Sequence, residues 1–316
     1  MKSTILDLLW RRLASALLTL LIVSFAIFFA TSLLPGDVTE ILLGQAATPE
    51  AVAGLRDAMH LNDPAIIQFL KWLGGLVTGD LGTSYSNNMP VADLIGRRLV
   101  NTLELGLVTA IISVPLSLAL GITAAINHGT AYDRAVSALT IGVISVPEFL
   151  VAIAAQLIFA VYLKWLPALS LATDVSSIGE LIRIYTMPVI TLIFVISAQM
   201  TRMTRAAVIE TLHTPYVEMA QLKGASRGRV VFRHALPNTL GPIFNAIALS
   251  ISYLLGGVII VETIFNYPGI AKLMVDAVAT RDLPLIQSCA MIFCVGYLAL
   301  VTIADIVATL SNPRLR

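Results

Sequence analysis

Charged side chains are scarce in this chain. Asp, Glu, Lys and Arg make up 12% of its 316 residues, against about 25% in ordinary soluble domains. Hydrophobic residues make up 57% of the chain, and the mean hydropathy is +0.88. Several apolar stretches approach the ~20 residues with which a helix crosses the hydrocarbon of a bilayer. The composition therefore excludes a soluble globular domain and predicts an all-α integral membrane protein, because helices satisfy their own backbone hydrogen bonds in lipid.

Residue patterns that carry chemistry are also lacking. The two cysteines, Cys289 and Cys294, stand five residues apart in one apolar run; on a helix they point to different faces and cannot form a disulfide. The sequence contains no G-x-x-x-x-G-K-[ST], H-E-x-x-H or G-x-S-x-G motif, and its four histidines lie outside the apolar runs. We therefore expect no catalytic residues, no metal site and no bound cofactor in this chain.

Six apolar runs are present. The first is longer than the ~7–15 apolar residues of a signal peptide and is not followed by a clear cleavage site, so we interpret it as a retained helix. The sequence predicts six transmembrane helices, one N-terminal helix plus a five-helix core. The runs are Leu13–Leu34, Leu103–Ile126, Ala135–Leu163, Tyr185–Met200, Leu240–Ile260 and Ile286–Leu310.

The connections between the runs differ in charge. The two termini and the connections 127–134 and 201–239 hold most of the Lys and Arg residues, whereas acids outnumber bases in the connections 35–102, 164–184 and 261–285 taken together. The positive-inside rule makes the basic set cytoplasmic, including both termini. We expect two parts: residues 1–95, the first helix with an extracytoplasmic insert, and residues 96–316, a core with a cytoplasmic loop at about 201–239.

The insert itself shows helix signals. Thr48 and Pro49 are typical of an N-cap and a first helical residue, and the apolar spacing that follows predicts two short amphipathic helices. "TGDLGTSYSNN" is typical of a loop, and "PVADLIGRRL" predicts a further short helix before the second span.

Prolines and acids inside the apolar runs mark candidate functional positions. Pro115, Pro147 and Pro188 each predict a kink, either for packing or as a hinge. Acids in hydrocarbon are costly and should face protein, water or a boundary. Glu104 and Asp305 lie near run ends, which favours an interfacial or structural role. Glu148 follows Pro147 and is a deeper candidate for a translocation pathway, with Glu104 as a second candidate.

The loop at 201–239 contains residues typical of the starts and ends of two short helices. Thr214 and Pro215 predict a helix start, Glu218 falls in the first turn, and Gly224 is a natural helix end. Tyr216, Val217 and Ala220 offer a small apolar surface. Ser226 could cap a second short helix that ends or is disrupted at Pro237. Such a unit is too short to bury a core alone, so it must rest on the bundle or on a partner.

The residues of this loop carry a specific resemblance. "YVEMAQLKGAS…RHALPNTLGPI" resembles the cytoplasmic EAA loop of permeases of binding-protein-dependent ABC importers. Met219 stands where Ala is common. "LPGD", "WLGGLVTGDLGTSY", "SVPEFL", "VETIFNYPGI" and the terminal "NPRLR" are similar to the dipeptide, oligopeptide and nickel subfamily, in particular the member of the permease pair with the larger insert. The matching loop positions are Glu218, Ala220, Gly224, His234, Ala235, Leu236, Asn238 and Pro242.

The resemblance implies a division of labour. This chain would form half of a translocation pathway in the bilayer of the inner membrane, together with a second homologous permease. Two cytoplasmic ATPase subunits, which bind ATP and Mg²⁺, would dock on the two loops, and an extracytoplasmic solute-binding protein would deliver the solute. The residues implied in coupling are Arg205, Tyr216, Glu218, Ala220, Gly224, His234 and Asn238. Di- and oligopeptides are the favoured cargo, with nickel complexes or other small solutes as the alternative.

Three other functions fit the residues less well. An ion-coupled secondary transporter predicts paired acids at the membrane midplane and inverted repeats, and neither is clear here. An intramembrane enzyme needs a catalytic constellation within a span. Nucleic-acid binding is disfavoured because no aromatic–basic interleaving or fold module accompanies the basic loop.

Overall fold

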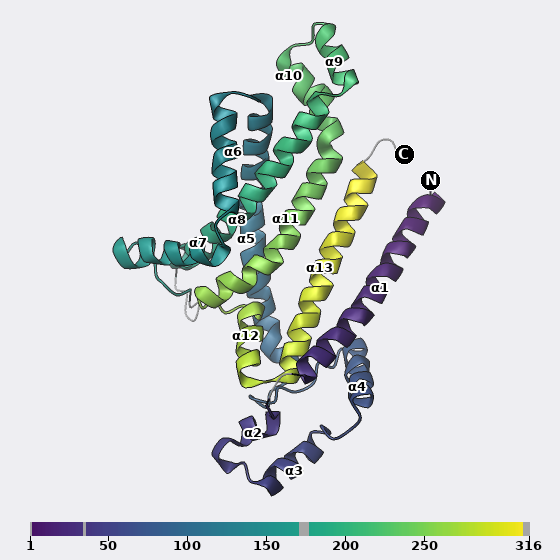
Figure 1. Cartoon of the computed structure of the whole chain (residues 1–316), viewed down its shortest axis with the longest axis vertical. Helices are drawn as coiled ribbons and strands as arrows, with labels where there is room; N and C mark the ends of the chain where they lie inside the picture. The colour runs from purple at the N-terminus through teal and green to yellow at the C-terminus, as the bar shows by residue number, and fades with distance from the viewer. Residues whose placement is uncertain (1, 34–35, 171–176, 312–316) are drawn as a thin grey trace. The chain divides into compact units, whose positions relative to one another are not determined.

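The computed structural model of the chain (Figure 1) describes residues 2–33, 36–170 and 177–311. The sequence elements at Leu34–Pro35 and the terminal "NPRLR" beyond Ser311 lie outside the described residues, as does the side chain of Asp305. The chain forms two compact units. Unit 1 contains Leu103–Tyr267 with the two chain ends, and unit 2 contains Trp10–Thr102 and Pro268–Gly296.

Long apolar helices dominate both units, as the composition predicts. Five helices in the described part of the chain are long and apolar enough to cross a membrane, and a bent helix pair raises the number to six if it counts as one span. This confirms the all-α membrane class. The five helices are α1 Lys2–Ser32, α5 Val91–Ile126, α8 Ile178–Leu212, α11 Leu236–Ile264 and α13 Leu283–Ser311.

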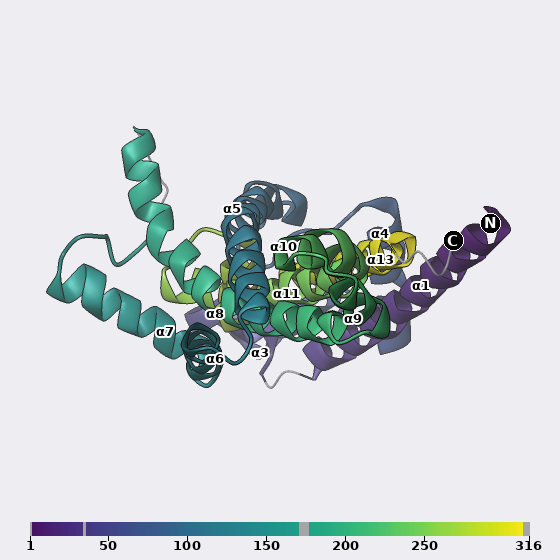
Figure 2. The same ribbon diagram turned by 90° about the horizontal axis from the view of Figure 1, so that it is seen from above.

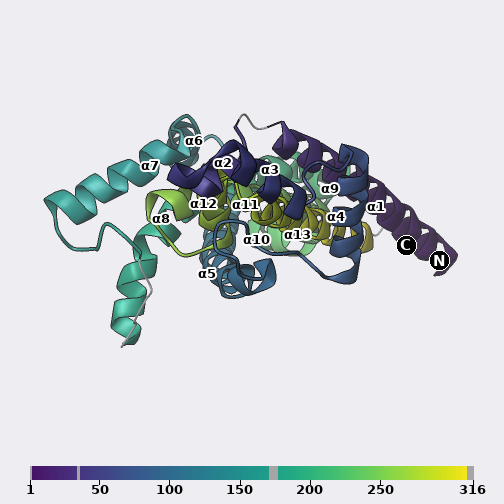
Figure 3. The ribbon, with the colours of Figure 1, turned by 90° about the horizontal axis from the view of Figure 1, so that it is seen from below.

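The third apolar run is the bent pair. Helix α6 (Ala131–Ile144) and helix α7 (Glu148–Ala155), which continues as the π-helical segment η2 (Gln156–Tyr162), meet at an angle of 96°. The break falls at Pro147, which has an extended conformation and precedes the first residue of α7. Figures 2 and 3 show α7 running sideways from the end of α6. Pro115 and Pro188, by contrast, lie inside the unbroken helices α5 and α8.

The connections of unit 1 gather at two ends. One end, called the loop end here, carries the connection between α8 and α11. There His128, in the turn after α5, and Asp133, in the first turn of α6, both bind Arg205 of α8. At the far end, Ser170 donates its N–H to the carbonyl of Phe265 at 2.7 Å, and Gln156 donates to the carbonyl of Ile264 at 3.1 Å. The bent pair therefore leads from one end of unit 1 to the other, which is what a single crossing requires.

Unit 2 holds the insert. It contains α2 (Val38–Leu43), the short 3₁₀ turn η1 (Gly44–Ala46), α3 (Pro49–Ala58), α4 (Ala65–Thr78) and α12 (Ile270–Thr280). Thr48 caps α3, because its hydroxyl oxygen accepts the N–H of Ala51 at 3.2 Å, and this confirms the predicted helix start. The hydrophobic core of unit 2 joins the start of α5 to α12 and α13. Its buried residues are Val91, Ile95, Ile270, Leu273, Ala277, Leu285, Ile286 and Cys289.

A buried carboxylate organises the loop 79–90 of this unit. Asp282 is fully buried and accepts hydrogen bonds from the hydroxyls of Ser84 and Ser86 and from the N–H groups of Tyr85 and Ser86. This confirms "TGDLGTSYSNN" as a loop and explains how it is held. One expectation is wrong: "PVADLIGRRL" is no separate helix, because α5 runs without interruption from Val91 into the second span.

Candidate functional site

The loop end of unit 1 carries a short helix, α9 (Pro215–Leu222). Thr214 is its N-cap residue and Pro215 its first helical residue, as predicted, but the Thr214 side chain does not cap the helix. The hydroxyl of Thr214 instead donates to the carbonyl of Thr211 at 2.6 Å, which ties α9 to the end of α8.

Helix α9 ends in a left-handed glycine turn. Gly224 has φ +81°, and its N–H bonds the carbonyl of Gln221 at 2.9 Å. The N–H of Ala225 bonds the carbonyl of Ala220 at 3.1 Å. This pair of hydrogen bonds is the Schellman pattern, which satisfies carbonyls at a helix end and strongly favours glycine at the left-handed position. The predicted role of Gly224 in the turn is confirmed.

The two faces of α9 differ. Val217 is fully buried and packs with Val230 and Ala235. The opposite face leaves apolar side chains in the open: Tyr216, Met219, Leu222 and, beyond the turn, Phe232. The expected surface of Tyr216, Val217 and Ala220 is therefore wrong in one member, because Val217 points inward and anchors the helix. Glu218 is exposed, and Ala220 is partly buried.

The segment after the turn is also helical, although not as expected. Residues Arg227–Arg229 form α10, Val230–Ala235 form the π-helical turn η3, and α11 follows at once from Leu236. Pro237 thus does not end a helix. In the wider turn, the N–H of Leu236 bonds the carbonyl of Val231, five residues back, so the helix passes the proline that lacks a donor. The side-chain amide of Asn238 donates to the carbonyl of His234 at 2.8 Å.

The base of this end is fixed by a buried ion pair. Asp133 on α6 is 2% exposed and accepts from Nε of Arg205 at 2.5 Å and from Nη2 at 2.8 Å. It also accepts the N–H of Gly129 at 3.0 Å, and its Oδ2 lies 3.1 Å from Nδ1 of His128. Arg205 therefore does not lie in a loop, because it belongs to α8, which extends to Leu212. Its guanidinium forms an ion pair with Asp133 within unit 1.

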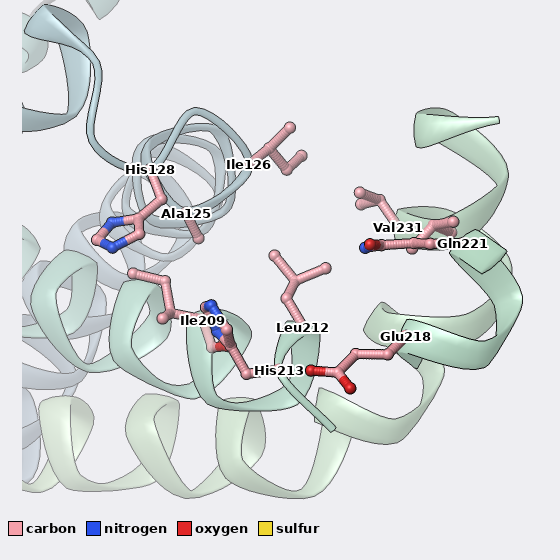
Figure 4. A pocket seen from close by; sticks show the side chains of 10 residues that line it. Ala125, Ile126, His128, Ile209, Leu212, His213, Glu218, Gln221 and Val231 are labelled. Atoms are coloured by element: carbon pink, nitrogen blue, oxygen red, sulfur yellow. The ribbon is translucent and has the colours of Figure 1, made fainter. Parts of the chain in front are cut away.

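A cavity of about 250 Å³ separates α9 from this base (Figure 4). Glu218 extends from α9 toward the end of α8 at Leu212 and His213, while Ala125 at the end of α5 and His128 in the turn after it line another wall. Glu218 and two histidines, His213 and His128, line the same cavity, an association that no pattern in the sequence predicts. Of the predicted coupling residues, Tyr216, Glu218, Ala220 and Gly224 share α9 and its turn; His234 and Asn238 lie after it.

The far end of unit 1 holds Glu104. The hydroxyl of Tyr185 donates to Glu104 at 3.3 Å, and the hydroxyl of Tyr267 donates to Tyr185 at 2.8 Å. Burial raises the pKa of Tyr267, so its phenol keeps the proton that it donates. Glu104 thus lies inside α5, in a hydrogen-bond chain that leads to Tyr267 in the connection after α11. Its interfacial or pathway role stays a prediction.

Glu148 occupies a different environment. It is the first residue of α7 and lines a pocket of about 460 Å³ together with residues of α6, α8 and α11. Three of the lining side chains are polar, those of Glu148, Gln199 and Tyr253. The other lining residues are apolar. Gly257 leaves room for the acid, because a Cβ there would lie 3.1 Å from its Oε2.

Sequence reasoning missed three buried acids. Asp133, Glu262 and Asp282 are each at most 2% exposed. Asp133 precedes an arginine in a polar connection, and Asp282 follows one, so both look like surface residues in the sequence. No local signal could identify their partners, because Arg205 lies 72 residues from Asp133 and Ser84 lies 198 residues from Asp282.

Comparisons with known proteins decide the family. The family described as binding-protein-dependent transport system inner membrane component matches residues 117–316, and its N-terminal companion matches residues 5–106. The chain belongs to this family. It is therefore a multi-pass membrane protein of a family of transport components, which agrees with the resemblance seen in the loop.

Two similar proteins span nearly the whole chain. A protein named as a probable peptide ABC transporter permease from Sinorhizobium fredii is 34% identical over 97% of this chain and 98% of its own length. A glutathione transport system permease protein from Salmonella paratyphi A is 32% identical over 98% of this chain and 99% of its own. The match extends through the insert, both units and the loop end.

Proposed function

We propose that this chain is the permease subunit of an ATP-driven ABC importer for di- and oligopeptides. The observation that carries the proposal is its family membership together with relatives named as peptide and glutathione permeases along nearly the whole chain. A second homologous permease completes the pathway, two ATPase subunits supply the energy, and a solute-binding protein delivers the cargo.

Helix α9 is the proposed coupling element. It is fixed to unit 1 by the buried Val217, by the hydrogen bond between Thr214 and Thr211, and by the Schellman turn at Gly224. Its outer face offers Tyr216, Met219 and Leu222 beside Glu218. A helix that is held rigidly and presents apolar side chains suits a groove on an ATPase subunit.

Movement of α9 would be transmitted to the long helices. α8 enters the loop segment His213–Ala235 and α11 leaves it, and the Asp133–Arg205 pair joins α8 to α6. Closure of the two ATPases on ATP would push both coupling helices together, and rocking of the rigid bundles would expose the pathway on the other side. In this proposal the loop end and both chain termini are cytoplasmic, in agreement with their basic charge.

Reconstitution tests the proposal. Proteoliposomes that contain this chain, its partner permease and the ATPases should accumulate tripeptide from the binding protein only when ATP is present on the ATPase side. Import by vesicles that contain this polypeptide as their only protein would contradict the proposal. Mass spectrometry of the ligand retained by the cognate binding protein distinguishes peptides from nickel complexes or sugars.

A further inference from the structure

The pocket around Glu148 lies halfway along unit 1. Its lining residues on α8 are Val195, Gln199 and Met203, and those on α11 are Leu249 and Tyr253. Each group falls near the middle of its helix, and the remaining residues come from the break between α6 and α7. The pocket therefore lies away from both ends of α8 and α11, within the apolar stretch of each helix.

Glu148 is an acid without a balancing charge at this depth. Among the described residues, Tyr253 is the only group that binds its carboxylate, and no Lys, Arg or His forms an ion pair with it. A carboxylate in a membrane-spanning segment is costly unless it faces protein partners or a water-filled space. The chain bends by 96° and carries glycine at position 257 at the point where this carboxylate needs room.

The side chains of the pocket define what it would accept. The Glu148 carboxylate is a hydrogen-bond acceptor, and the Tyr253 hydroxyl can accept as well. The side-chain carbonyl of Gln199 already accepts from Nη2 of Arg202 at 3.4 Å. Val143, Val195 and Leu249 supply an apolar wall. Acceptors on one side and aliphatic carbons on the other suit an alkylammonium group, whose three N–H donors would bind the carboxylate with charge assistance.

We propose that this pocket binds the protonated amine of the cargo during its passage, with Glu148 as the residue that recognises the charge. The inference rests on the proposed peptide import, which supplies cargo with such amines. Two sources fit the chemistry, the α-amine of a peptide and the side-chain amine of a lysine. Leu249 and Tyr253 are both exposed, so the pocket opens at the surface of this chain.

Direct binding to the purified complete transporter, without the binding protein, tests the inference. The probes are trialanine, N-acetyl-trialanine and N-acetyl-alanyl-lysine, and saturation-transfer NMR measures their dissociation constants. The wild type should bind at least one amine-bearing peptide about tenfold more tightly than N-acetyl-trialanine. Preference for trialanine alone assigns the α-amine as the source, and preference for the lysine peptide alone assigns the side chain.

Variants then assign the effect to the carboxylate. Glu148→Gln, which keeps the size of the side chain, should abolish the preference. Glu50→Gln, which removes a charge from the exposed helix α3, should keep it. If the Glu148→Gln complex does not assemble, the wild type still decides: n-butylammonium should displace trialanine, and n-butanol should not.

Two results overturn the inference: no preference for amines in the wild type, or an unchanged preference in Glu148→Gln. Failure of the proposed function gives a different result. In that case the reconstituted transporter does not import tripeptides with ATP, although the amine preference and its loss in Glu148→Gln persist.

Discussion

The loop end and the bend of unit 1 use their charged groups in opposite ways. At the loop end, Asp133 is buried and its carboxylate is bound by Arg205, His128 and the backbone of Gly129. At the bend, Glu148 is half-buried, faces a pocket and has only Tyr253 as a described partner. Both acids belong to the same bent pair, α6 and α7. The loop end thus holds its acid with several internal partners, whereas the bend holds its acid with one described partner, beside a pocket.

Breaking the ion pair should have the largest effect on stability. Arg205→Met leaves the Asp133 carboxylate buried without its cation, and we expect a loss of about 3–5 kcal/mol in the free energy of unfolding. Thermal unfolding in detergent measures it. The control is Arg202→Met, an exposed arginine on the same helix, which should change stability by no more than about 0.5 kcal/mol. Equal unfolding temperatures for the two variants would refute the structural role of the pair.

A substitution in the glycine turn at Gly224 should cause the second-largest loss of stability. Gly224→Ala forces a side chain into the left-handed region at φ +81°, at a cost of about 1–2 kcal/mol. No heavy atom lies within 4 Å of the added Cβ, so the cost is conformational and not steric. Gly228→Ala is the matched control, because Gly228 is helical and its Cβ is equally free; it should stabilise slightly.

The same two glycine variants should also differ in how ATP hydrolysis is coupled to peptide import. We expect ATP hydrolysis to continue in Gly224→Ala transporters while the number of peptides imported per ATP falls, because α9 no longer holds its orientation. Gly228→Ala should keep the wild-type ratio. The turn assignment is wrong if both variants import alike.

Reversing the charge on α9 should weaken the ATPase contact. Glu218→Lys changes an exposed charge at the edge of the proposed interface, where single ion pairs contribute up to about 1 kcal/mol, so affinity should fall about fivefold. Glu210→Lys, an exposed acid on α8, is the control. Pull-down of the ATPase from membranes measures both, and retention by Glu218→Lys equal to the wild type would remove Glu218 from the interface.

Removing the charge at the bend should have the smallest effect on stability. Glu148→Gln keeps a hydrogen bond to Tyr253 and breaks no ion pair, so we expect a change within about 0.5 kcal/mol. The contrast with Arg205→Met is the sharpest form of the comparison. A large loss of stability in Glu148→Gln would mean that this acid, too, serves the fold.

Local sequence signals predicted the local structure well. Thr48 with Pro49, Thr214 with Pro215, and Gly224 each mark an element boundary through backbone geometry that a few residues determine. The apolar runs likewise predicted the long helices, since length and hydropathy suffice for that.

Local sequence signals did not predict the structure where tertiary contacts determine it. Pro237 has the pattern of a helix end, but the π-helical turn before it lets the helix continue. Pro115, Pro147 and Pro188 look alike in the sequence, yet only Pro147 stands at a break. Arg205 looks like a free basic residue of the loop, and its partner Asp133 can be found only in three dimensions.

Site-directed cross-linking tests the central claim, that α9 is the contact for the ATPase, most directly. Cysteine is placed at Leu222 or at Tyr162, which are 81% and 79% exposed and lie on α9 and at the end of η2, in a chain with Cys289 and Cys294 replaced by alanine. The account predicts that Leu222→Cys cross-links to a cysteine-bearing ATPase subunit, with a yield that changes on ATP binding, and that Tyr162→Cys does not. Cross-linking of Tyr162→Cys with none from Leu222→Cys would contradict it.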